Sequence, residues 1–297
     1  MSTLCLGEAL VDLVCERPVS SLADADAFVA HCGGAVANVA IAAAREGAHV
    51  ALAGGVGDDA WGSWLRERLE AEGVELEWFT LVADASTPVA FVAVDGAGEP
   101  EFHIYGEGIV SGLRALGGRL EQAVQAADGL FFSSNTLVGE EERELTMRAR
   151  ELALAAGKPV VLDPNLRLAR WGSMASAIDA VMACVHGSLL VRSNEAEAEL
   201  LTGKPDPIRA AEELVNNGAR LAVVSRGARG AVLRGELRAE VSGVRARVVN
   251  TMGAGDAFTG VLLGRLAATG FYPPAVAAAL PDAVAAGARA TERWGAL

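Results

Sequence analysis

The stretch Asn250-Thr251-Met252-Gly253-Ala254-Gly255-Asp256-Ala257-Phe258 is the most informative part of this 297-residue chain. Its small residues at 253–255 let the backbone approach a ligand closely. The Ala-rich residues that follow, to about Ala268, predict a helix. The free N–H groups and the dipole at a helix N-terminus favour a bound anion. Asp256 in the first turn is either a stabilising N-terminal charge or a general base beside that anion.

Outside this stretch, short apolar runs alternate with longer helical patterns. The strands predicted from the apolar runs are Leu4–Leu6, His49–Ala53, Gly129–Phe132, Pro159–Leu162, Ser188–Val191 and Leu221–Val224. The helices predicted from apolar periodicity are Val36–Arg45, Trp61–Ala71, Glu140–Ala156, Ser176–Cys184, Glu195–Leu201, Ile208–Asn217 and two Ala-rich helices from about Ala254 and about Pro274. A hairpin is expected over Gly230–Val241. This order predicts one α/β domain, 1–297, with a mostly parallel central sheet and helices on both faces.

A second, smaller sheet is predicted where the β-then-α order breaks down. Val89–Val94 and Glu101–Tyr105 have strand character and are joined by the turn-forming residues 95–98. The residues after Glu8 also alternate in hydrophobicity. We therefore expect a small β lid built from segments near 9–18 and 86–106. Because a small exposed sheet presents an edge and a face that require cover, the lid also predicts a homodimer.

The composition excludes several classes of partner. The formal net charge is −13, from 25 basic and 38 acidic residues, so the general field of the protein would repel nucleic acid. No apolar run approaches the roughly 18–20 residues that a membrane span needs, which predicts no membrane association. No charged segment precedes the first apolar stretch, as a signal peptide would require. The four cysteines lack the spacing of a zinc site. We therefore expect a cytoplasmic protein with reduced thiols.

Two common nucleotide-binding motifs do not fit. A P-loop needs a lysine followed by Ser or Thr, but Lys158 and Lys204 are each followed by proline. Residues 55–60 (Gly-Val-Gly-Asp-Asp-Ala) match the short dinucleotide-binding pattern, but they follow the second predicted strand, not the first. Two aspartates would also lie where a pyrophosphate binds. A P-loop enzyme and a nicotinamide enzyme are therefore disfavoured.

The stretch 250–258 resembles the C-terminal signature of the ribokinase-like (PfkB) carbohydrate kinases. Further motifs resemble that family in the same order along the chain, and the stretch 163–167 is typical of its fructokinase and 2-keto-3-deoxygluconate kinase branch. These motifs are Gly7-Glu8 with Asp12, Gly33-Gly34-Ala35-Val36-Ala37-Asn38, Gly54–Asp59 with Gly62, Asp163-Pro164-Asn165-Leu166-Arg167, Asn194-Glu195-Ala196-Glu197 and Ser225-Arg226-Gly227 with Gly230. The resemblance implies a ribokinase-like fold and ATP-dependent phosphorylation of a sugar hydroxyl.

The resemblance also implies a role for each matching residue. Asp256 would be the catalytic base, and the amides of Gly253, Ala254 and Gly255 would form the anion hole for the transferred phosphate. The implied sugar-binding residues are Asp12, Gly33, Gly34, Asn38, Tyr105, Asp163 and Arg167. The implied nucleotide-binding residues are Asn194, Ser225, Gly227, Gly230 and Ala286. Glu197, with Asn194, would order Mg²⁺ near the ATP phosphates.

Two departures from the family pattern bear on cofactor and substrate. Asn250 stands where relatives carry an aspartate that helps to bind a monovalent cation, so the sequence predicts weak K⁺ dependence. Gly106, followed by the acidic Glu107, replaces an arginine that usually comes after Tyr105. An acidic sugar thereby loses a partner for its carboxylate, which favours a neutral sugar such as fructose and leaves the choice among neutral sugars open. A ketodeoxygluconate, ribose or nucleoside kinase is the alternative, and a catalytically silent sugar-binding relative is the alternative from another class.

Overall fold

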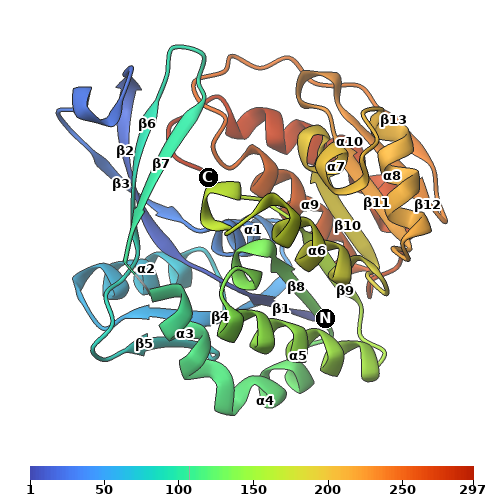
Figure 1. Ribbon diagram of the computed structural model, residues 1–297, viewed down its shortest axis with the longest axis horizontal. Coiled ribbons are helices and arrows are strands. Elements are labelled where there is room, and N and C mark those ends of the chain that lie inside the picture. Colours follow the sequence, from blue (N-terminus) through green and yellow to red (C-terminus); the bar gives the residue numbers. More distant parts are fainter. Residues whose placement is uncertain (107) are drawn as a thin grey trace.

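The computed structural model describes residues 1–106 and 108–297, and it contains two β-sheets (Figure 1). The larger sheet has nine strands in the described chain. In sheet order they are β13 (Ala239–Val241), β12 (Ala231–Gly235), β11 (Leu221–Ser225), β10 (Leu190–Asn194), β9 (Val160–Asp163), β8 (Gly129–Ser133), β1 (Ser2–Leu6), β4 (His49–Gly57) and β5 (Phe79–Val82). In this order every neighbouring pair from β11 to β5 is parallel, whereas β11–β12 and β12–β13 are antiparallel. The predicted mostly parallel sheet and the predicted hairpin are confirmed.

Helices cover both faces of this sheet, as predicted. They are α1 (Ala35–Arg45), α2 (Ala60–Ala71), α3 (Gly108–Leu116), α4 (Leu120–Ala126), α5 (Glu140–Ala155), α6 (Met174–Val185), α7 (Glu195–Thr202), α8 (Pro207–Asn216), α9 (Ala254–Ala268) and α10 (Pro274–Ala290). Short 3₁₀ turns lie at Leu22–Asp24, Gly117–Arg119, Ser134–Leu137, Leu168–Arg170 and Gly227–Arg229. None of the helices in the described part of the chain is both long and apolar enough to span a bilayer.

The strands divide their side chains between two separate cores. In β1, Cys5 packs into the core beneath α1, α2, α9 and α10, whereas Leu4 and Leu6 pack into the core beneath α3 to α8. The same alternation occurs in β9, where Val161 faces the first core and Leu162 the second. Since successive side chains of a strand point to opposite faces, a continuous apolar strand fills both layers.

The smaller sheet is the predicted lid, with the strand order β3-β2-β6-β7. Its strands are β2 (Leu10–Pro18), β3 (Val29–Gly33), β6 (Val89–Val94) and β7 (Pro100–Tyr105). These strands stand together at the upper left in Figure 1, separate from the strands of the large sheet. The sequence did not predict β3, because its side chains are mostly half-buried and lack a clear apolar alternation. It also did not predict the helices α3 and α4 or the edge strand β5.

The misleading glycine motif at residues 55–60 has a structural role. Asp59 is the N-cap of α2, and its carboxylate accepts from the backbone N–H of Gly62 at 2.8 Å. The same carboxylate accepts from the backbone N–H and the hydroxyl of Thr87, at 2.8 and 2.7 Å. The aspartate therefore joins the start of α2 to the base of the lid.

Candidate active site

A cavity of about 580 Å³ lies between the lid and the carboxyl ends of the central strands. This is where α/β sheets usually bind ligands, and the volume suits a small molecule. The lid contributes Leu10, Asp12, Ala90, Phe102 and Ile104 to its wall. The central sheet and its helices contribute Glu8, Gly34, Asn38, Asn135, Asn165, Arg167, Arg170, Arg192, Asn194, Glu197, Ser225, Gly227 and the segment 251–256.

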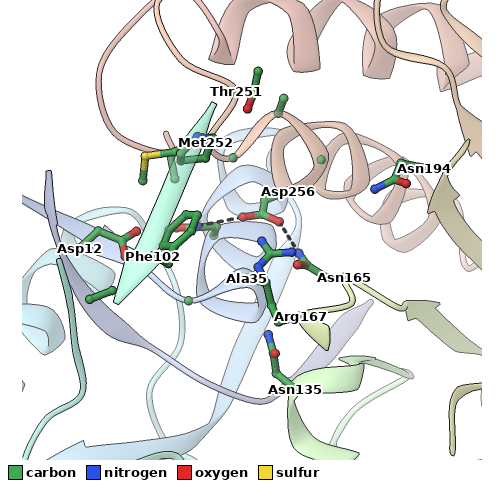
Figure 2. Close-up of a pocket in the computed structure, with 18 of the residues that line it drawn as sticks. Asp12, Ala35, Phe102, Asn135, Asn165, Arg167, Asn194, Thr251, Met252 and Asp256 are labelled. Atoms are coloured by element: carbon green, nitrogen blue, oxygen red, sulfur yellow. Dashed lines mark hydrogen bonds between the residues drawn. The ribbon is translucent and has the colours of Figure 1, made fainter. Parts of the chain in front are cut away.

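Asp256 lies in the first turn of α9, at the centre of the cavity wall shown in Figure 2. Its carboxylate accepts from Asn38 Nδ2 at 2.9 Å and from Asn165 Nδ2 at 3.1 Å. Asn38 belongs to α1, and Asn165 follows the carboxyl end of β9. Two amides from different elements therefore fix both oxygens of Asp256.

Burial gives Asp256 the protonation behaviour of a base that works near neutral pH. Loss of water around this carboxyl raises its pKa to about 7, with a further rise from the charge of Asp163. The hydrogen bond from Asn38 and the guanidinium groups of Arg167 and Arg192 oppose the rise. A carboxylate of this pKa can accept a proton and still be ionised at physiological pH.

Asp12 is a second buried acid in the same cavity. It lies on β2 with 4% of its surface exposed, and burial, followed by the charge of Asp256, raises its pKa to about 8. Gly33 pairs with Leu10 across β2 and β3, and a Cβ atom on Gly33 would lie 2.4 Å from the Asp12 carboxyl carbon. Gly34, at φ 95°, likewise approaches the backbone of Glu8 too closely for a side chain. Asp12 and Gly34 line the cavity, whereas Gly33 stands behind Asp12.

The small residues 253–255 border the cavity at the start of α9. Gly253 has φ 66°, and a Cβ atom there would lie 2.0 Å from the carbonyl oxygen of Ala296. A Cβ atom on Gly255 would lie 2.9 Å from Arg192 Nη1. Glycine is therefore required at position 253, where the backbone of the C-terminal segment packs directly against it. At position 255 a side chain would have to displace the buried guanidinium of Arg192.

Asp163, a predicted sugar-binding residue, does not line the cavity. Its carboxylate accepts from Arg192 Nη1 at 3.2 Å and from Thr259 Oγ1 at 2.6 Å. Arg192 Nη2 also donates to Ser225 Oγ at 2.8 Å, and the guanidinium stacks 5.1 Å from the Phe258 ring. Asp163 therefore holds Arg192 in place beneath the start of α9, and it is Arg192 that faces the cavity.

Asn194 and Glu197 lie in the cavity wall and form the capping box of α7. The Glu197 carboxylate accepts from the backbone N–H groups of Asn194 at 3.0 Å and Leu166 at 2.8 Å. Burial, and then the charge of Asp163, raises the pKa of Glu197. Among residues 1–106 and 108–297, no cluster of three or more Asp, Glu, His or Cys side chains is arranged to hold a metal ion. Any metal here would need further ligands from water or substrate.

The remaining predicted residues divide into two groups. Ser225 and Gly227 line the cavity, and Arg167 lines it with its guanidinium 5.8 Å from the ring of Phe102 on the lid. In Figure 2 the side chain of Arg167 extends between Asp256 and Asn135. The residues that do not line the cavity are Tyr105, Gly230 and Ala286, in addition to Gly33 and Asp163.

Each of these three residues has a different environment. Tyr105 is 59% exposed and packs edge-on against Phe91, on the lid face opposite Phe102 and Ile104. Gly230, at φ 93°, makes the turn into β12, and Ala286 packs within α10 against the first core. Glu107 lies outside the described residues.

The structure adds polar residues to the site that the sequence did not assign. Glu8, 2% exposed, accepts from the backbone N–H of Ala35 and from Asn135 Nδ2 through a single oxygen, Oε1. Arg170 Nη1 donates to Asn135 Oδ1 at 3.0 Å. For Arg192 a signal existed, because a charged residue within an otherwise apolar strand is unusual. Asn135 follows β8 in a 3₁₀ turn with no comparable pattern.

Comparison with known proteins agrees with this geometry. The profile of the pfkB family carbohydrate kinases matches residues 2–296. This chain belongs to the PfkB carbohydrate kinase family. Probable fructokinase-7 of Arabidopsis thaliana is 35% identical over 268 residues, covering 89% of this chain and 78% of that relative. Fructokinase-1 of Oryza sativa subsp. japonica is 35% identical over 266 residues, covering 88% and 81%.

Solved structures of the PfkB family share the whole fold. The PfkB protein from Polaromonas sp. JS666 has a TM-score of 0.85 at 29% identity, covering 98% of this chain and 96% of that one. A fructokinase double mutant from Vibrio cholerae O395, solved with fructose, ADP and potassium ion, has a TM-score of 0.84 at 27% identity, covering 99% and 93%. Aminoimidazole riboside kinase from Salmonella enterica scores 0.84 at 27% identity, covering 100% and 95%. The predicted ribokinase-like fold is confirmed, and the protein is a sugar kinase.

Proposed function

We propose that this PfkB kinase transfers the γ-phosphoryl group of ATP to a hydroxyl of a neutral sugar, most simply fructose. The observation that carries the proposal is the position of Asp256. A buried carboxylate with a pKa of about 7 lies in the first turn of a helix whose N-terminal residues are Gly253, Ala254 and Gly255. Phosphoryl transfer needs both parts, a base for the acceptor hydroxyl and donors for the phosphate charge.

The reaction follows from this arrangement. Asp256 takes the proton of the sugar hydroxyl as that oxygen bonds to the γ-phosphorus. The bond from the γ-phosphorus to the β,γ-bridging oxygen breaks, and ADP leaves with the electron pair. The amides at 253–255 and the positive end of the α9 dipole stabilise the charge on the equatorial oxygens. The lid over the cavity excludes water, which would otherwise accept the phosphoryl group.

The nucleotide is proposed to lie toward Asn194, Ser225 and Gly227, which line the end of the cavity beside α7 and β11. Amide and carboxylate oxygens at Asn194 and Glu197 are the ligand types that Mg²⁺ prefers. Both Glu197 oxygens already accept backbone hydrogen bonds, but each retains a lone pair for a metal-bound water. When bound, Mg²⁺ would neutralise charge on the ATP phosphates.

Unused acceptors in the cavity support a neutral polyhydroxyl substrate. Glu8 Oε2, Asn38 Oδ1 and Asn165 Oδ1 are buried and have no hydrogen-bond partner in the described part of the chain. All three residues line the cavity. Buried acceptors require donors, and sugar hydroxyls supply them, whereas a sugar carboxylate does not. Gly106 in place of arginine agrees in part, because it removes one cation with which the carboxylate of an acidic sugar could pair.

The test is ADP release with a panel of fructose, ribose, 2-keto-3-deoxygluconate and nucleosides, at saturating MgATP. The nucleosides are included because a riboside kinase is among the structural neighbours. We expect the highest kcat/KM with a neutral sugar. In Asp256→Asn we expect kcat to fall about 10²–10⁴-fold, the usual loss when a general base is removed. If the wild-type protein shows no sugar-stimulated ADP release, it is a catalytically silent sugar-binding relative. If Asp256→Asn keeps full activity, Asp256 is not the catalytic base.

We also propose a homodimer formed through the lid, and a cytoplasmic location. The outward lid face carries the edge-on aromatic pairs Phe28–Phe91 and Phe91–Tyr105, and Tyr105 is 59% exposed. An apolar face of this kind supports association. The four cysteines are free thiols, and three of them are buried, in keeping with a reducing compartment.

A further inference from the structure

Asn250 lies three residues before Gly253, in the loop that leads into α9, and none of its surface is exposed. Its Oδ1 accepts from the backbone N–H of Met252 at 2.7 Å, which fixes the orientation of the amide. Its Nδ2 then faces the opposite way and donates to the backbone carbonyl of Arg293. The side chain therefore uses a donor and an acceptor to join two segments that are distant in sequence.

The second segment forms part of the wall beside the small residues 253–255. Backbone N–H groups of Val249 and Asn250 donate to the carbonyl of Thr291, at 2.7 and 3.3 Å. Farther along, the carbonyl of Ala296 packs against Gly253 so closely that a Cβ atom would not fit. The segment 291–296 thus supports the start of α9, and the Asn250 amide holds this segment to the loop 249–253.

A monovalent cation does not fit this arrangement. A cation would have to be coordinated by oxygen atoms such as the Arg293 carbonyl, but here an N–H group of Asn250 donates to that oxygen. An aspartate at position 250 would instead place a second acceptor against the same carbonyl. Two acceptors in contact repel each other, so a cation or a proton would have to lie between them.

We infer that Asn250 is a positioning residue that makes the anion hole independent of a monovalent cation. Its amide N–H provides the link between the two segments that a cation would provide beside an aspartate. The catalytic part of this inference rests on the anion-hole role proposed above for residues 253–255. The structural part, a cation-free link, does not depend on it.

The first experiment uses the wild-type protein without substrate, in KCl, NaCl or choline chloride at equal ionic strength. We expect the same Tm in all three salts, and sugar-dependent ADP release that varies less than about 2-fold. A Tm or a kcat that depends strongly on K⁺ would overturn the inference. Since the Tm is measured without sugar or ATP, failure of the sugar panel leaves this part of the test intact.

The second experiment introduces the carboxylate with Asn250→Asp. In choline chloride we expect its Tm to fall by about 3–8 °C, the effect of apposing two buried acceptors. KCl should restore most of this loss, and kcat should become K⁺-dependent. The matched control is Asn216→Asp, which makes the same charge change at an exposed position of α8. Its Tm and kcat should be the same in KCl and in choline chloride.

A third variant, Asn250→Ala, tests the positioning role of Asn250 without creating a cation ligand. It also keeps the inference testable if Asn250→Asp does not fold. It removes the link without adding a charge. We expect kcat to fall about 10-fold with little change in the KM for sugar, and no recovery in KCl, because no new cation ligand is created. The inference would be wrong if kcat were unchanged in Asn250→Ala, or if K⁺ changed neither the Tm nor the kcat of Asn250→Asp. Either result would show that the Asn250 amide does not replace a cation.

Discussion

At the scale of single residues, burial is what makes Asp256 suitable as a base. An exposed aspartate is ionised far below neutral pH and is a weak base, whereas the pKa of Asp256 is raised to about 7. Two amides, from Asn38 and Asn165, keep its oxygens oriented. The hydrogen bond from Asn38, and then the charges of Arg167 and Arg192, oppose a larger rise in the pKa of this carboxyl.

The first residue-scale prediction concerns pH. Because the base must be ionised, kcat/KM should rise about 10-fold per pH unit below pH 7 and level off above it. The measurement is the pH profile of kcat/KM with the preferred sugar at saturating MgATP. An acid limb centred near pH 4, the value for an exposed aspartate, would contradict the assignment of the buried Asp256 as the group that titrates.

The second residue-scale prediction concerns Arg192, whose guanidinium lowers the pKa of Asp256. Arg192→Gln should move the acid limb of the pH profile to higher pH. It should also destabilise the protein by about 3–5 kcal/mol, because Asp163 would remain buried without its partner. Arg192→Lys keeps the charge and should leave the acid limb in place. Arg238→Gln, which removes an exposed arginine, is the control, and an unshifted limb in Arg192→Gln would exclude the electrostatic role.

At the scale of elements, the packing of α1 against α9 fixes the site, because α1 carries Asn38 and α9 carries Asp256. Gly260 lets the two helices approach, since a Cβ atom there would lie 2.2 Å from Ala42 Cβ. A larger residue would push apart the two helices that provide the hydrogen bond to the base. The catalytic geometry therefore depends on a glycine one turn away from the reacting atoms.

The element-scale prediction follows from this contact. Gly260→Ala should destabilise the protein by about 1–3 kcal/mol in urea unfolding, although alanine favours an isolated helix. Gly118→Ala is the control, because no atom lies within 4 Å of a Cβ built at Gly118. If Gly260→Ala proved more stable than wild type, helix propensity would outweigh the contact, and the close packing of α1 and α9 would not be limiting.

At the scale of the whole molecule, the lid connects the site to the surface. Its inner face carries Asp12 and Phe102 into the cavity, and its outer face carries the exposed Tyr105 against Phe91. The turn between β6 and β7 also contacts the loop before α9, where Thr251 N–H donates to the Gly98 carbonyl at 2.9 Å. The same small sheet therefore closes the cavity and presents an apolar surface to solvent.

The whole-molecule prediction is a dimer through this outer face. Light scattering at micromolar concentration should give twice the mass of the chain, about 61 kDa against 30.5 kDa. Tyr105→Glu should weaken the dimer, because it places a charge in the contact. Tyr272→Glu, at a tyrosine that is similarly exposed but lies outside the lid, should not. A wild-type monomer at this concentration would remove the proposal.

The sequence alone determined the fold class and the centre of the site. Apolar runs that alternate with helical patterns can only pack as a parallel sheet between two helical layers, because each strand supplies both cores. The small residues before α9 and the acid after them predicted the anion site and its base. The edge strands β3 and β5 were not predictable in this way, because their half-buried residues give no regular pattern.

Only the tertiary structure decided which polar residues face the cavity. Asp163 and Tyr105 matched family motifs, yet one pairs with Arg192 behind the wall and the other lies on the outer face of the lid. Glu8 and Asn135 come together across 127 positions of sequence, a separation that no local pattern encodes. The stretch 250–258 showed the same limit. Its small residues predicted an anion site from local chemistry, but the role of Asn250 depends on a carbonyl 43 residues away, which only folding brings to it.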